Sequence, residues 1–199
     1  MRYLTIVAVV LAFGSLGAQE RSLPERLSPA TRTAIDRIVD SARVAGVPIA
    51  PLYDKAAEGV LKGALDDRIE RAVRTLFHEL SDARVALGPS AEPPLLSAAA
   101  SALHAGVSVG DLQRIARPSG SAPDASTLTT ALVTLVDLVA KRVPVALATS
   151  SIQSLVDRRA TDRQFTELRS AVEQDIRAGQ SPDASVTARV KLPGAVPPR

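Results

Sequence analysis

Apolar residues recur at helical spacing in three separate stretches of this 199-residue chain, and this periodicity limits the fold more than any other feature. Counted from Ile69, Leu128 and Phe165, apolar side chains return at offsets of 3, 7 and 11. That spacing gathers them on one face of an α-helix. The stripes are Ile69, Ala72, Leu76 and Leu80, then Leu128, Ala131, Leu135 and Val139, and finally Phe165, Leu168, Val172 and Ile176. Each stretch is predicted to be an amphipathic helix that packs on other helices.

Composition favours helices packed on helices over sheets packed on sheets. Aromatic residues make up only 3% of the chain, and the apolar residues are mainly Ala, Val and Leu. Sheets favour aromatic side chains, whereas small residues let helix axes approach closely. Because 46% of the residues are hydrophobic and 23% are charged, the chain can bury a core, and we expect an all-α fold.

The helical stretches form a candidate repeat. Gly46-Val47-Pro48 and Arg142-Val143-Pro144 start two similar segments 96 residues apart, and a third segment starts at Gly106. The first stripe residue follows these starts by 23, 23 and 22 residues, respectively. This agreement predicts three helical-hairpin units, roughly 46–85, 106–141 and 142–179, in a bundle or a short solenoid-like array. The alternative is that these are unrelated amphipathic helices, which also align with one another.

We expect one all-α domain over residues 28–179, after a mobile lead at 19–27. Ser28-Pro29 has the N-cap and first-turn residues of a helix start, and Gly46 suits its end. Residues 180–199 contain four prolines and are predicted to be a flexible tail. Within this tail Val186, Ala188, Val190 and Leu192 alternate with other residues, so the alternative is a strand that pairs with another protein's sheet edge.

The first 18 residues are typical of a cleaved secretory signal peptide. Arg2 precedes a nearly unbroken apolar run from Tyr3 to Phe13, and small residues follow it. Cleavage is expected near Gly17 or Ala18. The alternative is an uncleaved anchor, although the run is shorter than the roughly 20 residues that span a bilayer. We expect an exported protein, periplasmic or extracellular, with no transmembrane span in the mature chain.

Charge gives one candidate for a binding surface. The formal net charge is only +3, and acids are mixed among the basic residues, so we expect no nucleic-acid binding. Arg68, Arg71 and Arg74 lie three residues apart and could present a basic stripe to an anionic envelope lipid or polymer. The alternative is an ordinary solvated face, because Asp67 and Glu70 lie at pairing distance.

No motif indicates a particular enzyme. The chain has no Cys, which excludes thiol nucleophiles and Cys-bound metals. His78 and Asp82 share a helix face around Glu79, as in half of a zinc-protease motif, but a third ligand is missing and the predicted stripe turns His78 toward water.

Asp66 and Asp162 are interpreted as helix N-caps, His104 as a helix-end cation, and Thr149-Ser150-Ser151 as part of a polar helix side. We expect no catalytic residues, no metal site and no cofactor.

These observations favour an exported, non-enzymatic protein of the cell envelope with an interaction or structural role. Its partner would be an unknown protein or envelope component. The alternatives are a binder of anionic envelope lipid or polymer, or a carboxylate-dependent hydrolase.

Overall fold

The computed structural model describes residues 22–118 and 122–191, and within these ranges the chain is helical with no strand. The all-α prediction is confirmed. The helices are α1 (Pro29–Ala45), α2 (Ala50–Leu61), α3 (Asp66–Leu87), α4 (Pro93–His104), α5 (Val109–Ala116), α6 (Ala125–Ala140), α7 (Val145–Asp157), α8 (Asp162–Arg177) and α9 (Pro182–Lys191). None of these described helices combines the length and apolar character that crossing a membrane requires. The predicted signal peptide at 1–18 lies outside the described residues.

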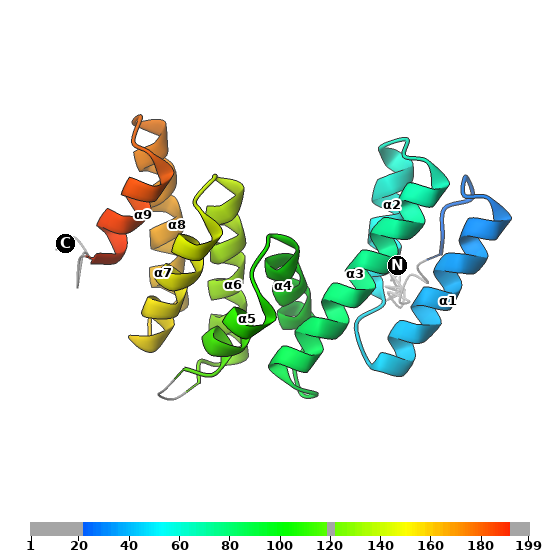
Figure 1. Ribbon diagram of the computed structural model, residues 1–199, viewed down its shortest axis with the longest axis horizontal. Coiled ribbons are helices and arrows are strands. Elements are labelled where there is room, and N and C mark those ends of the chain that lie inside the picture. The colour runs from blue at the N-terminus through cyan, green and yellow to red at the C-terminus, as the bar shows by residue number, and fades with distance from the viewer. Residues whose placement is uncertain (1–21, 119–121, 192–199) are drawn as a thin grey trace, which may run out of the picture.

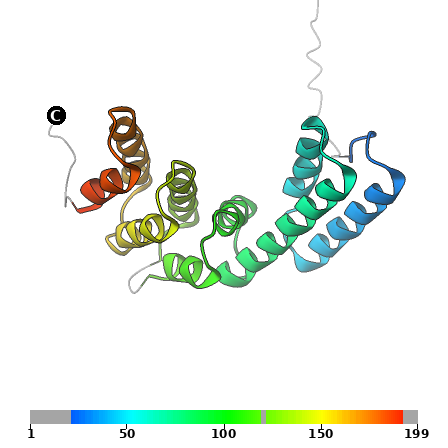
Figure 2. The ribbon, with the colours of Figure 1, turned by 45° about the horizontal axis from the view of Figure 1, so that its top comes forward.

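The helices follow one another along an arc, with α1 at one end and α9 at the other (Figures 1 and 2). Helices α4, α6 and α8 pack side by side in one layer, and α5, α7 and α9 pack side by side in a second. The long helix α3 contacts α1, α2, α4 and α5, and so joins the N-terminal helices to these layers.

The packed sequential pairs in the two layers are α4–α5, α6–α7 and α8–α9. The predicted units 106–141 and 142–179 combine α5 with α6 and α7 with α8, so the packed pairs cross the predicted unit boundaries. The proposal that the units are copies of one repeat stays a prediction.

The predicted stripes face the core along most of their length. Ile69 and Leu80 of α3 are buried, while Ala72 and Leu76 are half-buried because the buried face turns toward Val73. The stripes of α6 and α8 are buried at their first three positions and half-buried at Val139 and Ile176. Phe165 is among the largest fully buried side chains described.

Close packing of small residues shapes the centre of the array. Helix α4 lies against α3, α5 and α6, and its buried alanines are Ala98, Ala99, Ala100 and Ala102. Nearer the N-terminus, α2 approaches α3 at Gly59, where an added Cβ would lie 2.7 Å from Cγ1 of Ile69. These contacts require the absence of larger side chains, because filled interiors accept little extra volume.

One turn geometry recurs between the helices. A residue in the left-handed region ends the helix, and the next N–H donates to the carbonyl five residues back, as in Val47 to Ala42 and Val143 to Leu138. This is the hydrogen bond of a Schellman motif. Glycine occupies the left-handed position in four such turns, at 46, 63, 106 and 179, whereas Arg142 (φ 67°) and Arg159 (φ 58°) occupy it in two.

The structure differs from the sequence prediction near both ends of the domain. Residues 182–191, predicted to lie in a flexible tail or a strand, form α9 and pack on α7 and α8. Tertiary contacts outweigh the strand-like alternation there, because the period of two needs a partner strand to be satisfied. In the predicted mobile lead, Leu27 is 3% exposed and belongs to the core.

Candidate functional site

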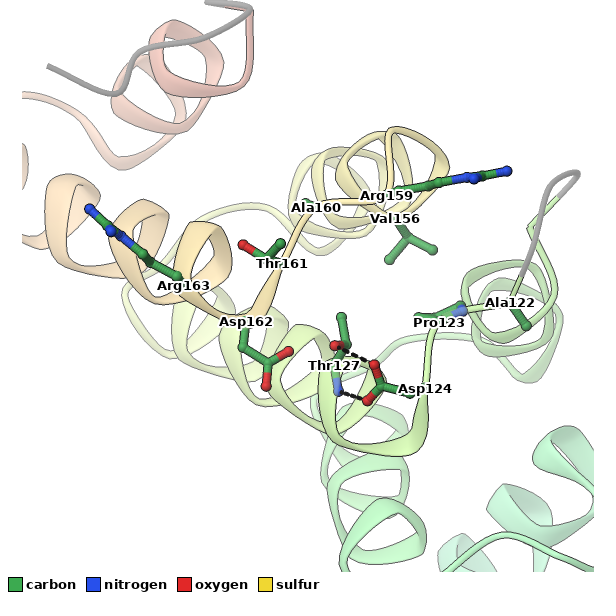
Figure 3. Close-up of a pocket in the computed structure, with 10 residues that line it drawn as sticks. All are labelled: Ala122, Pro123, Asp124, Thr127, Val156, Arg159, Ala160, Thr161, Asp162 and Arg163. Atoms are coloured by element: carbon green, nitrogen blue, oxygen red, sulfur yellow. Dashed lines mark hydrogen bonds between the residues drawn. The ribbon is translucent and has the colours of Figure 1, made fainter. Parts of the chain in front are cut away.

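One surface hollow lies at one edge of the array, where the start of α6, the end of α7 and the start of α8 meet (Figure 3). Its volume is about 460 Å³. It is lined by Ala122, Pro123, Asp124, Thr127, Val156, Arg159, Ala160, Thr161, Asp162 and Arg163. The geometry of the two helix starts decides which polar groups reach it.

Two carboxylates line this hollow in different surroundings. Asp124 is the N-cap of α6 and accepts hydrogen bonds from the backbone N–H (2.9 Å) and the hydroxyl (3.0 Å) of Thr127. These bonds hold the pKa of Asp124 below its usual value. Asp162 accepts from the hydroxyl of Ser126 at 3.1 Å, while its Oδ1 is buried and has no hydrogen-bond partner among the described residues. Thr161, rather than Asp162, is the N-cap of α8, which corrects the N-cap interpretation of Asp162.

Two guanidinium groups balance these carboxylates. Arg163 pairs with Glu167 at 2.6 Å, and this contact raises the pKa of Arg163. Arg159 is exposed and follows the end of α7 in the left-handed turn. Figure 3 shows both arginine side chains pointing away from the centre of the hollow, in opposite directions. Two aspartates and two arginines give the lining no formal net charge. The lining holds threonine hydroxyls but no histidine that could activate them as nucleophiles.

A second hollow, of about 400 Å³, lies between the C-terminal parts of α1 and α3. Its lining residues are Ala45, Ser81, Arg84, Val85, Gly88 and Pro89. Val85 is 73% exposed, and Val44, next to Ala45 in the chain, is 91% exposed. We call the hollow together with Val44 the valine patch. Exposed aliphatic side chains on two helices that pack together are the kind of surface that macromolecular contacts cover.

The predicted basic stripe lies on α3, where Arg68, Arg71 and Arg74 are all exposed. Arg71 pairs with Asp67 at 3.0 Å and Arg74 with Glu70 at 2.6 Å, each one helical turn away. These acids offset two of the three positive charges, so the stripe presents much less positive potential than its arginines alone would give.

The two histidines have different surroundings in the described structure. His78 is exposed, as the stripe predicted. His104, at the end of α4, lies with Nδ1 2.8 Å from Oε1 of Glu79 on α3. This pair was missed because its members are 25 residues apart and no local spacing connects them. Within residues 22–118 and 122–191, no three His, Cys, Asp or Glu side chains converge as metal ligands.

The hydroxyl cluster of α7 is placed differently from the prediction. Thr149 is 6% exposed and Ser151 is 4% exposed, so only Ser150 lies on the polar side. The hydroxyl of Thr149 has no hydrogen-bond partner among the described residues. Helix α7 packs on α5, α6 and α9, and these neighbours cover positions that an isolated helix would expose.

Comparison of the chain with protein-family models, curated proteins and solved structures gave no match.

Proposed function

We propose that this protein is exported to the cell envelope and binds another macromolecule through its helical array, without catalysing a reaction. The observation that carries the proposal is the valine patch on α1 and α3. Val44 and Val85 are the large hydrophobic side chains of α1 and α3 that are exposed in the described part of the chain. Burying two valines in a contact would contribute about 3–6 kcal/mol before the costs of association.

The curved arrangement of the helices supports a binding role. Stacked helices expose one long surface instead of one deep cleft, and such surfaces commonly bind extended partners. Both described hollows are open at the surface, and the charged lining of the larger one is internally balanced. Export is inferred from the signal-like residues 1–18 alone.

The first test is capture of partners in the native host by cross-linking the tagged protein and isolating it from cell fractions. The informative variant is Val44→Asp with Val85→Asp. The matched control is Leu61→Asp with Leu65→Asp, since these leucines are 87% and 72% exposed on the α2–α3 turn. We expect a reproducible protein partner that survives the leucine changes and is lost with the valine changes.

Two results would count against this proposal. Recovery in the cytoplasmic fraction, with the N-terminal 18 residues retained, would contradict export. Recovery of lipid or polymer in place of a protein, lost in high salt and after Arg68, Arg71 and Arg74 are changed to Gln, would favour the anionic-ligand alternative.

A further inference from the structure

Helix α9 is attached to the array by fewer buried apolar groups than its neighbours. Among residues 182–190 only Ser185 and Val186 are buried. By comparison, α8 buries three apolar side chains and α6 buries five. Burial of apolar area is the main stabilising contribution to helix packing, so α9 is the weakly held end of the second layer.

An ion pair compensates in part for this small apolar contact. Arg189 of α9 donates from Nε to Oδ2 of Asp175 at 2.9 Å and from Nη2 to Oδ1 at 2.7 Å. Asp175 lies on the buried face of α8 and is 8% exposed. Such two-pronged contacts are the strong form of an arginine–carboxylate pair, and removal of one partner leaves a buried charge without compensation.

The turn that leads into α9 also lacks an anchor that four of the other five such turns have; in the fifth, after α2, Ala64 is half-buried. In the turns after α1, α4, α6 and α7, the residue after the left-handed position is buried, and these residues are Val47, Val107, Val143 and Ala160. After α8 the same position is Gln180, which is exposed. Gly179, just before it, has φ 90° and open space around the position of a Cβ. The backbone angles of this turn can therefore change without displacing a buried side chain from the core.

We propose that α9 is a hinged end helix that leaves the array as a unit while α1–α8 stay folded. Gly179 and Gln180 form the hinge, and the Arg189–Asp175 pair is the latch. A hydrogen bond from Arg158 at the end of α7 to the carbonyl of Val190 (3.2 Å) is the second polar link. Opening uncovers the surfaces of α7 and α8 that α9 covers. This opening is an equilibrium of the protein alone and does not require a bound partner.

Hydrogen exchange of the purified protein, followed by mass spectrometry, tests this directly. Peptides from α9 should exchange at least about tenfold faster than those from α6 and α8, because local opening precedes global unfolding. Arg189→Gln should speed exchange in α9 by a further factor of about ten or more, and leave α1–α6 unchanged. The control is Arg177→Gln, whose arginine pairs with Glu173 on the exposed side of α8. It should leave exchange in α9 unchanged.

Spin labels distinguish departure of the helix from fraying in place. The chain has no Cys, so cysteines at exposed Ser150 on α7 and Ala188 on α9 would carry the only labels. We expect one short label-to-label distance in the otherwise unchanged protein, and an added longer population after Arg189→Gln. The proposal is overturned if α9 exchanges only with global unfolding, if Arg189→Gln accelerates all helices equally, or if faster exchange comes without the longer distance.

Discussion

The backbone N–H of Ser28 donates a hydrogen bond to Oδ2 of Asp66 at 2.9 Å, across 38 residues of chain. Ser28 is the N-cap of α1, where its hydroxyl accepts from the N–H of Thr31 at 3.3 Å. Asp66 is the first residue of α3, whose N-cap is Leu65. A carboxylate at the start of one helix thus binds the start of another and holds the two N-termini together, which is a different role from the predicted N-cap of its own helix.

Replacing Asp66 with Asn should make the free energy of unfolding less dependent on pH. Hydrogen bonds from the side chain and backbone of Ser28 lower the pKa of Asp66 in the folded protein. The carboxylate therefore stabilises the fold fully above its unfolded pKa of about 4, and this contribution is lost as the pH falls through the lower folded pKa.

Urea unfolding at pH 7 and pH 3 measures this effect. We expect the difference in unfolding free energy between the natural protein and Asp66→Asn to shrink at the lower pH. Asp36→Asn on the exposed side of α1 is the control. An Asp66→Asn difference that is the same at both pH values would show that the carboxylate's charge is not involved.

Replacing either Arg142 or Arg159, whose backbones are in the left-handed region, with glycine should stabilise the protein. Arg142 and Arg159 have positive φ angles, which cost an L-residue about 1 kcal/mol relative to glycine, and both side chains are exposed. Allowing for the greater freedom of glycine in the unfolded chain, each change should raise the unfolding free energy by roughly 0.5 kcal/mol. Thermal and urea unfolding would measure it. Ala178→Gly, at an exposed position with an ordinary φ of −79°, should destabilise instead, and a gain there would refute the explanation.

Gly59→Ala should destabilise the contact between α2 and α3. Alanine favours the helix by about 1 kcal/mol, but its Cβ would lie 2.7 Å from a carbon of Ile69, which is 2% exposed. Overpacking of this kind costs about 1–3 kcal/mol, so the net change should be a loss. Combining Gly59→Ala with Ile69→Ala should cost less than the sum of the two single changes in unfolding experiments. If the losses of unfolding free energy from the two single changes simply add, the two residues are not in contact.

Truncation of Phe165 should be among the most damaging single changes in the core. Its ring is fully buried at the start of α8, and Phe→Ala changes in cores typically cost about 3–5 kcal/mol. Phe77, which is only half-buried, provides the comparison. Equal losses of unfolding free energy for Phe165→Ala and Phe77→Ala would contradict the difference in burial.

Local sequence patterns were sufficient for much of the secondary structure. The start and end of α1 follow from Ser28, Pro29 and Gly46, because capping and left-handed turns depend on only a few neighbouring residues. The buried faces of α3, α6 and α8 follow from apolar periodicity for the same local reason. The exposure of His78 follows from that periodicity as well.

The amino-acid sequence alone determined that the described residues are all-α and where α1, α3, α6 and α8 lie, because helix periodicity and capping are short-range properties. Only the tertiary structure decided that residues 182–191 form a helix, that Thr149 and Ser151 are buried, and that Glu79 meets His104. Each of these outcomes depends on residues far apart in the chain or on the neighbours that cover a helix side. Such contacts lie beyond the span of any local pattern, as does the hydrogen bond from Ser28 to Asp66 that joins α1 to α3, the two helices that carry the valine patch.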